Sequence, residues 1–278
     1  MRYLFLLIFI FSSVILIRII FIDLYIVPSA SMEPTLISGD FILVSKHLCG
    51  PRILKIGKFY NKRIVEYTRL FSKENIGMND VIVFNVPTLN ARRESLYNPF
   101  GNVYVKRCVA LPGDTLEILK NEELYSREKY VFKGRLNKQQ QYLSQTKKNY
   151  TELFPHDTSY HWTIQKYGPL WIPQKKQNIK LSLKSYILYK NIIDYEKSYF
   201  KSTDSSYINS NVIESYAFKF NYYFMQGDNF FGSRDSRFWG FVPETHIIGK
   251  AVLVLFSIDP HVPWYRCFRW KRLFKKIK

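Results

Sequence analysis

Ser31 lies in a segment whose composition suits nucleophilic chemistry. The segment reads Pro28-Ser29-Ala30-Ser31-Met32-Glu33-Pro34-Thr35-Leu36. Small residues flank Ser31, and Pro34 stiffens the turn that follows. Such a segment can present a hydroxyl group and backbone N–H groups to a substrate carbonyl. Taken alone, it is better explained as an ordinary serine-containing loop.

Lys106 lies in an apolar segment that can turn it into a base. The segment Tyr104 to Asp114 reads YVKRCVALPGD, which predicts a strand that ends at a Pro-Gly-Asp turn. On a strand, Lys106 and Arg107 face opposite sides, so one cation is expected to lie against apolar neighbours. Burial destabilises the charged amine and lowers its pKa. A fall from about 10.4 to about 8 requires roughly 3 kcal/mol.

Two further segments stand out, one rich in polar residues and one that is apolar and typical of a buried strand. Gly227-Asp228-Asn229 is followed by Gly232-Ser233-Arg234-Asp235-Ser236-Arg237, a stretch dense in polar groups and turn formers. There Asp235 and Arg237 can form a buttressing ion pair, and Ser233 can hydrogen-bond a nearby base. Residues 80–84 (DVIVF) predict a core strand.

These four segments, in this order, resemble those of the bacterial type I signal peptidases, which are serine–lysine endopeptidases. The resemblance covers most of the chain from the N-terminal apolar segment to about Ile258, apart from residues 120–216. It implies that Ser31 is the nucleophile and that Lys106 is the general base. It also implies that Ser29 and the Ser31 N–H form the oxyanion hole.

The resemblance assigns the supporting residues and the reaction as well. Ser233 would hydrogen-bond the lysine, Asp235 and Arg237 would form a structural pair, and Tyr104 would line the substrate pocket. The implied substrates are preproteins with small residues before the cut, in the Ala-x-Ala pattern. No metal or other cofactor is implied, and nucleic acid is not an expected partner.

The chain departs from the family pattern at a few positions near the expected site. Ala30 stands where glycine is common, and Asn79 replaces a usual glycine before Asp80. Phe230, Phe231 and Gly232 replace a usual polar run before Ser233. These changes put the local geometry around Ser233 in question and leave the nucleophile and base intact.

The N-terminal segment, residues 1–23, predicts a transmembrane anchor. Leu4 to Ile22 is apolar except for Ser12, Ser13 and Arg18, and it approaches the roughly 20 residues that span a bilayer. A cleaved signal peptide is the alternative. Cleavage near Ser29–Ala30 would cut through the strongest motif of the chain, which favours an anchor. The resemblance implies a single-pass protein of the bacterial plasma membrane, with its catalytic part on the extracytoplasmic side.

The remaining chain predicts a mainly β fold. Residues 40–45, 80–84, 104–111, 115–119 and 250–258 are short apolar runs typical of strands, whereas 137–150 is polar and predicts a loop. Together with the resemblance, this predicts an antiparallel β catalytic core with an inserted second β-rich domain. The expected parts are an anchor (1–23), a first core part (24–119), the insertion (120–216), a second core part (217–260) and a tail (261–278).

Charge and cysteines say less about function. The net charge of +19 fits an acidic partner, but Lys and Arg are spread along the chain, which favours compositional bias. The tail from Arg266 to Lys278 is basic and aromatic, so it can be either a membrane-surface segment or a solvated end. Three cysteines without a CxxC spacing argue against a zinc site and a full disulfide framework.

Three alternatives remain open from the residues. A Ser–His–Asp triad could use one of the five histidines, although none lies in a peptidase motif. A membrane-anchored basic binding module would not need the Ser31 hydroxyl. A related Ser–Lys self-cleaving repressor would require a DNA-binding helix pattern, which the sequence lacks.

Overall fold

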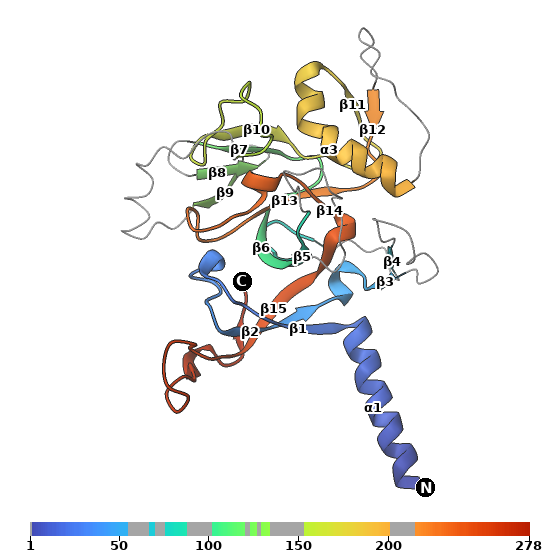
Figure 1. The fold of residues 1–278 in the computed structure, drawn as a ribbon, viewed down its shortest axis with the longest axis vertical. Coiled ribbons are helices and arrows are strands. Elements are labelled where there is room, and N and C mark those ends of the chain that lie inside the picture. Colours follow the sequence, from blue (N-terminus) through green and yellow to red (C-terminus); the bar gives the residue numbers. More distant parts are fainter. Residues whose placement is uncertain are drawn as a thin grey trace.

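The computed structural model describes residues 2–54, 67–69, 76–87, 102–119, 123–126, 129–133, 153–200 and 215–278. Two β layers stack along the long axis of the molecule, and helix α1 (Arg2–Ile20) projects from the lower one (Figure 1). The mainly β prediction is confirmed. The predicted loop at 137–150 lies outside the described residues.

The lower layer is an antiparallel sheet of eight described strands in the order β1-β2-β15-β5-β6-β13-β14, with β16 paired to β15. The predicted strands at 40–45, 80–84, 104–111 and 250–258 all lie in this sheet. The bounds are β1 (Ile22–Ile26), β2 (Asp40–Ser45), β5 (Val81–Asn85), β6 (Val103–Ala110), β13 (Tyr222–Gln226), β14 (Val242–Pro243), β15 (Ile247–Ser257) and β16 (Lys275–Lys276).

Burial follows the strand patterns of this sheet. Asp40, Ile42 and Val44 of β2 point inward, and the residues between them are partly exposed, as alternation requires. All five residues of β5 are buried, as expected for a strand in the middle of a sheet. β5 pairs with β6 in a register that sets Ile82 opposite Lys106. The strand that carries the lysine is therefore braced at the centre of the sheet.

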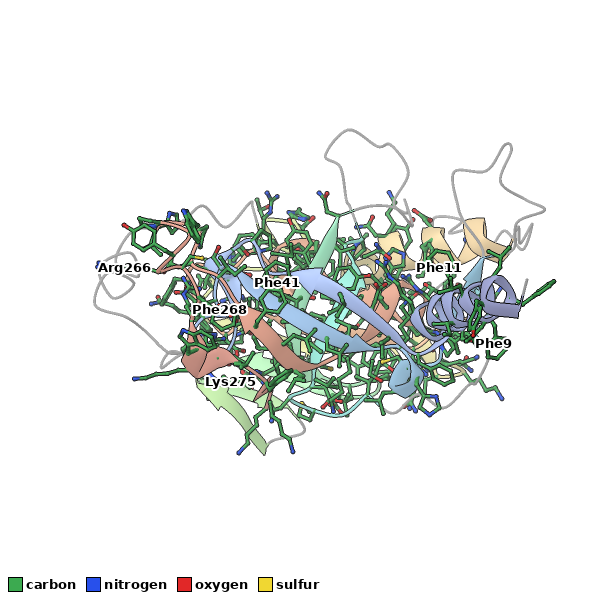
Figure 2. The ribbon with its side chains drawn as sticks, turned by 90° about the horizontal axis from the view of Figure 1, so that it is seen from below. Phe9, Phe11, Phe41, Arg266, Phe268 and Lys275 are labelled. Carbon is green, nitrogen blue, oxygen red and sulfur yellow. The ribbon has the colours of Figure 1, made fainter. Side chains whose placement is uncertain are left out.

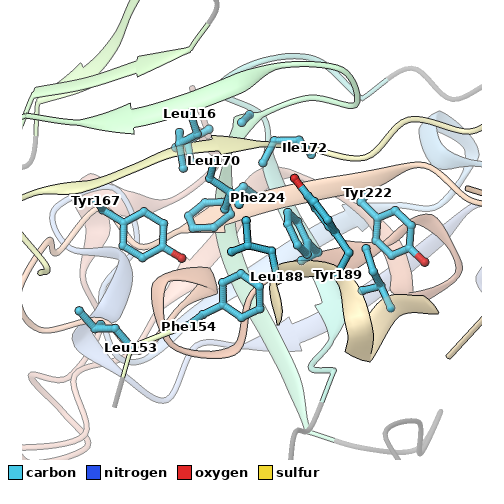
Figure 3. Close-up of a cluster of buried hydrophobic side chains, with 14 of the residues drawn as sticks. Leu116, Leu153, Phe154, Tyr167, Leu170, Ile172, Leu188, Tyr189, Tyr222 and Phe224 are labelled. Carbon is cyan, nitrogen blue, oxygen red and sulfur yellow. The ribbon is translucent and has the colours of Figure 1, made fainter. Parts of the chain in front are cut away.

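The upper layer holds a second sheet in the order β10-β7-β8-β9, together with helix α3. An aromatic-rich cluster joins the two layers, and it includes Tyr167 and Leu170 from β10, Tyr189 from α3 and Phe224 from β13 (Figure 3). The bounds are β7 (Thr115–Ile118), β8 (Glu123–Ser126), β9 (Lys129–Lys133), β10 (Tyr167–Trp171) and α3 (Leu183–Phe200). The domain boundaries expected from the sequence stay a prediction.

Short elements complete the described chain. The strand pairs β3–β4 and β11–β12 lie outside the two sheets. The bounds are β3 (Arg52–Leu54), β4 (Tyr67–Arg69), β11 (Asn178–Lys180), β12 (Ser215–Ala217), α4 (Ser236–Trp239), and the 3₁₀ turns η1 (Ala30–Met32), η2 (His47–Cys49), η5 (Glu244–His246) and η6 (Trp270–Arg272).

The N-terminal prediction is confirmed only as a helix. Helix α1 covers 19 residues, and the apolar side chains that the structure describes between Tyr3 and Phe11 are exposed. Among the helices in the described part of the chain, none has the combination of length and hydropathy that a bilayer crossing requires. The transmembrane anchor predicted for residues 1–23 is therefore not supported by the structure.

The C-terminal tail folds back on the lower sheet. Phe268 forms a bridge with Ile258, and β16 pairs with β15. The Phe268 ring stacks on Phe256 at a centroid distance of 6.4 Å. Trp264 and Trp270 remain largely exposed, at 86% and 74%. The tail is thus a docked part of the fold, whereas the sequence left it open between a membrane-surface segment and a solvated end.

Candidate active site

A single 3₁₀ turn, η1, presents Ser31 at the surface. The turn is closed by a hydrogen bond from Glu33 N to Ala30 O at 3.1 Å, and Leu36 N donates to Met32 O at 3.0 Å. The Met32 and Leu36 side chains are fully buried in the cluster under the lower sheet. Because these two buried side chains anchor the loop to the core, Ser31 is held in place with its side chain half-buried.

Strand β6 brings Lys106 to this serine from 75 residues further along the chain. The Lys106 Nζ lies 2.5 Å from Ser31 Oγ, within hydrogen-bond reach. Its side chain is only 1% exposed, although it is a lysine. The two residues that the sequence predicted as nucleophile and base therefore lie in direct contact.

Burial decides the protonation of Lys106. Desolvation lowers the pKa of its amine from the ordinary 10.5 to about 8. The carboxylates of Asp235 and Asp228 act in the opposite direction, and Arg237 adds to the fall. The loss of hydration outweighs the nearby acids, so the amine is neutral in roughly one molecule in ten at pH 7 and in half of the molecules near pH 8. A neutral amine can accept the proton of the Ser31 hydroxyl.

Arg107, the next residue, is buried too but is neutralised. Its guanidinium donates from Nε to Asp228 Oδ1 at 2.7 Å and from Nη2 to Asp228 Oδ2 at 2.6 Å. This bidentate geometry compensates a buried charge well. The sequence predicted one cation against apolar neighbours, and the structure buries both. Only the arginine has a carboxylate in hydrogen-bond contact among the described residues.

Asn229 was not singled out as a site residue, yet it holds the nucleophile turn directly. Its backbone N–H donates to Ser31 O at 3.2 Å, and its Nδ2 donates to Ala30 O at 3.1 Å. Two donors on two consecutive carbonyls fix the orientation of the turn. The Gly-Asp-Asn run was visible in the sequence, but nothing in it indicated which segment the asparagine would bind.

The predicted supporting residues gather around the same centre. Ser29 Oγ lies 3.3 Å from Ser31 Oγ. Asp235 and Arg237 form a fully buried ion pair with 2.8 Å between Oδ2 and Nη2. Ser233 is buried beside Gly227, but its hydroxyl has no hydrogen-bond partner within the described ranges. The expected hydrogen bond from Ser233 to Lys106 is therefore not formed.

The unusual Phe230 has a structural role next to this pair. The Arg237 guanidinium lies 4.4 Å from the centroid of the Phe230 ring, and its Nη2 donates to Phe230 O at 2.6 Å. The ring is fully buried in the cluster that joins the two layers. An aromatic face over a buried guanidinium replaces part of its lost hydration. The departure from the family pattern thus supports the Asp235–Arg237 pair.

A cavity of about 420 Å³ opens beside the Ser31–Lys106 contact. Ser29, Ser31 and Lys106 lie in its wall, and the rest of its lining is mostly apolar, including Tyr25, Ile26, Ile42, Val83, Tyr104 and Val105. Tyr104 lines this cavity and lies under the lysine, with Nζ 5.4 Å from its ring centroid, and its role in a substrate pocket stays a prediction.

The histidines of the described chain do not support a triad. None lines the cavity. His246 is buried elsewhere with its Nδ1 3.0 Å from Asn85 O, and burial lowers its pKa to about 3. The other four, His47, His156, His161 and His261, are exposed. Within the described ranges, no group of three His, Cys, Asp or Glu side chains is arranged to hold a metal ion.

Comparison with known proteins agrees with this geometry. The family model described as "Signal peptidase, peptidase S26" matches residues 1–256. The chain is 29% identical over 254 residues to a Signal peptidase I of Buchnera aphidicola subsp. Baizongia pistaciae, which covers 87% of this chain and 72% of the relative. It is 29% identical to the Signal peptidase I of Aquifex aeolicus (88% and 80% covered) and 27% identical to that of Haemophilus influenzae (96% and 73%).

Proposed function

The chain belongs to the signal peptidase family, peptidase S26, and on that premise we propose that it is a serine endopeptidase that removes N-terminal signal peptides from exported preproteins. The observation that carries the proposal is the contact between Lys106 Nζ and Ser31 Oγ, with the amine buried and its pKa lowered to about 8. A buried neutral amine next to an accessible hydroxyl is the arrangement that activates a serine without a histidine.

The chemistry proceeds in two halves. Neutral Lys106 takes the proton from Ser31 as the serine oxygen bonds to the scissile carbonyl carbon. The protonated lysine then gives this proton to the nitrogen of the leaving peptide as the C–N bond breaks. Water, deprotonated by the same amine, attacks the acyl-enzyme and releases the signal peptide with Ser31 restored. No step requires a metal or other cofactor.

Charge develops on the carbonyl oxygen in both halves, and donors near Ser31 would stabilise it. We assign this role to the Ser31 N–H and the Ser29 hydroxyl. Support comes from the position of Ser29 Oγ, 3.3 Å from Ser31 Oγ and in the wall of the same cavity. Loss of one such donor costs about 10²-fold to 10³-fold in kcat in serine peptidases.

The cavity suits small apolar side chains on the substrate. Its lining includes residues of β1 and β6 next to Ser31, with aromatic rings from Tyr25 and Tyr104, and Ile42 and Val83 from β2 and β5. Apolar walls of this kind accept an alanine side chain without leaving a polar group unpaired, which fits cleavage after Ala-x-Ala. A preprotein with phenylalanine in place of the alanine before the cut is expected to be a poor substrate.

We also place the enzyme at the bacterial plasma membrane, with its catalytic part on the extracytoplasmic side. Support comes from α1. The structure describes apolar side chains between Tyr3 and Phe11 that are 51% to 81% exposed. Ile22, Leu24 and Ile26 of β1 continue this apolar surface toward the cavity. Burying these side chains in a bilayer would bring the cavity to substrates that are held in the same membrane.

Cleavage of a preprotein in detergent tests the proposal. The wild type is expected to release the signal peptide, and Ser31→Ala is expected to lower the rate by at least about 10⁴-fold. Ser159→Ala, which removes a hydroxyl from an exposed loop, serves as the matched control and should cleave normally. Equal rates for Ser31→Ala and the wild type would refute the proposal and favour a basic binding module.

A further inference from the structure

Arg272 lies in the tail, beyond residues 1–256 that match the family model. It contacts the loop that runs from Ser31 to Asp40. From η6 its Nε donates to Asp40 Oδ1 at 2.7 Å and its Nη2 to Asp40 Oδ2 at 2.5 Å. The same Nη2 donates to Thr35 O at 3.0 Å. One guanidinium therefore ties together the two residues at the far end of the loop that begins at Ser31.

The carboxylate that receives this guanidinium is fully buried. Asp40 is 0% exposed, and its Oδ2 also accepts from Ile37 N at 2.9 Å, inside the loop. The Asp40 backbone closes the loop as well, because Val27 N donates to Asp40 O at 2.9 Å. A charge at this depth is stable only when it is paired, so Arg272 and the loop conformation depend on each other.

A second guanidinium also contacts the loop at Thr35. Arg107 Nη2 donates to Thr35 Oγ1 at 3.2 Å and is held by Asp228, which adjoins Asn229. Asn229 in turn binds Ser31 O. The loop is thus fixed near Ser31 by Asn229 and at Thr35 by two arginines, one from β6 and one from the tail.

The position of this loop sets the distance between Ser31 Oγ and Lys106 Nζ, on which the chemistry depends. Lys106 is buried on a central strand, whereas Ser31 is on a short turn, so the Ser31–Lys106 contact depends on the position of the loop. From this geometry we infer that Arg272 is a positioning residue, which acts through Asp40 and Thr35 to hold Ser31 Oγ against Lys106 Nζ. The inference rests on the proposed function, and a displacement of about 1 Å from such a contact can cost 10²-fold in rate.

The test compares Arg272→Gln, Arg272→Lys and the wild type in preprotein cleavage. Arg266→Gln is the matched control, because this exposed arginine is on the same tail and contacts the Tyr265 ring instead of the loop. Arg272→Gln should lower kcat about 10-fold to 100-fold with KM changed less than twofold. Arg272→Lys, which keeps the charge for Asp40 but cannot bridge to Thr35 O, should give an intermediate kcat.

Two further readouts separate positioning from a general loss of structure. Rates are measured at a temperature at which circular dichroism shows each variant fully folded, and the kcat loss should persist there. The pH midpoint of kcat/KM should stay at the wild-type value, because Arg272 does not bury Lys106. If Arg272→Gln does not fold, Arg272→Lys is the deciding variant.

The outcomes are distinct. Normal kcat in folded Arg272→Gln, or normal kcat in Arg272→Lys where Arg272→Gln does not fold, overturns the inference and leaves the proposed function standing. An equal loss in Arg266→Gln also overturns it, because the effect would then belong to the tail as a whole. An inactive wild type would instead overturn the proposed function itself.

Discussion

At the scale of single residues, β6 carries two adjacent buried basic residues, of which only one has a carboxylate partner among the described residues. Arg107 is buried with a bidentate carboxylate partner, whereas Lys106 is buried against Ser31 and apolar side chains. Their alternation along the strand was visible in the sequence. The partner of Arg107 was not, because Asp228 lies 121 residues away and a local pattern cannot indicate which loop reaches it.

The buried amine of Lys106 should cost stability. Its pKa is about 8 in the folded chain and 10.5 unperturbed. Between these values the unfolded chain binds more protons, so this group makes the folded state more stable as the pH rises from about 8 to 10.5. Below pH 8 both states are protonated, and the folded chain bears the full cost of the buried charge, as much as about 3 kcal/mol.

Lys106→Met is therefore expected to abolish cleavage and to raise stability at pH 7. The thioether side chain fills similar space without a charge. The free energy of unfolding, measured by urea denaturation, should increase by as much as about 3 kcal/mol, and the gain should shrink toward pH 10. A Lys106→Met protein that cleaves preproteins, or one that is less stable than the wild type at pH 7, would contradict this view of the site.

At the scale of elements, the site is a junction of one turn, one strand and one loop. The turn η1 supplies Ser31, β6 supplies Lys106, and the segment at Gly227–Asn229 packs on both. Gly227 allows this close approach, since a Cβ there would lie 2.2 Å from Ser233 Oγ and 2.5 Å from Ser31 O. The three elements can meet only because this residue has no side chain.

Gly227→Ala should accordingly displace the Ser31 turn. We expect kcat/KM to fall by about 10²-fold or more, since a shift of about 1 Å suffices for that loss. Gly77→Ala is the matched control, because a Cβ at Gly77 would meet its nearest atom, Asp80 Oδ2, at an ordinary 3.6 Å. Wild-type kinetics in Gly227→Ala would show that the turn does not depend on this packing.

The strands of the lower sheet were predictable from sequence, and their mutual contacts were only partly so. Runs such as 40–45 and 80–84 carry the alternation or continuous apolarity that strands require, and both are strands in the structure. Ser31 and Lys106 were predicted through the family resemblance. The roles of Asn229 and Arg272 depend on long-range docking, for which neither residue type nor spacing gives a signal.

At the scale of the whole molecule, apolar and basic side chains gather on the face that carries α1. Seen from below, Phe9 and Phe11 lie on α1 at one side, and Arg266, Phe268 and Lys275 lie on the tail at the other, with Phe41 between (Figure 2). The tail also exposes Trp264, Tyr265 and Trp270, and basic side chains beside exposed aromatic ones suit an anionic lipid surface. The sequence indicated each end of this face, but only the folded chain brings both ends to one side.

Binding to vesicles tests this face. Wild-type protein should float with vesicles that contain anionic lipid, and Phe9→Asp with Phe11→Asp should abolish flotation, because each Asp costs about 3 kcal/mol in a bilayer. Leu183→Asp on α3 is the control, because this side chain is 81% exposed and α3 lies at the end of the molecule opposite α1 (Figure 1). Equal flotation of all three proteins would contradict membrane binding through α1.

The pH dependence of preprotein cleavage tests the Lys106 assignment most directly, with Ser31→Ala as the blank. A base with a pKa of about 8 is neutral in roughly one molecule in ten at pH 7. We therefore predict that kcat/KM rises almost tenfold per pH unit below pH 8, passes its midpoint near pH 8 and levels off above it. A profile that is flat from pH 6 to pH 9, or whose midpoint lies near 10.5, would contradict a buried neutral amine as the base of this enzyme.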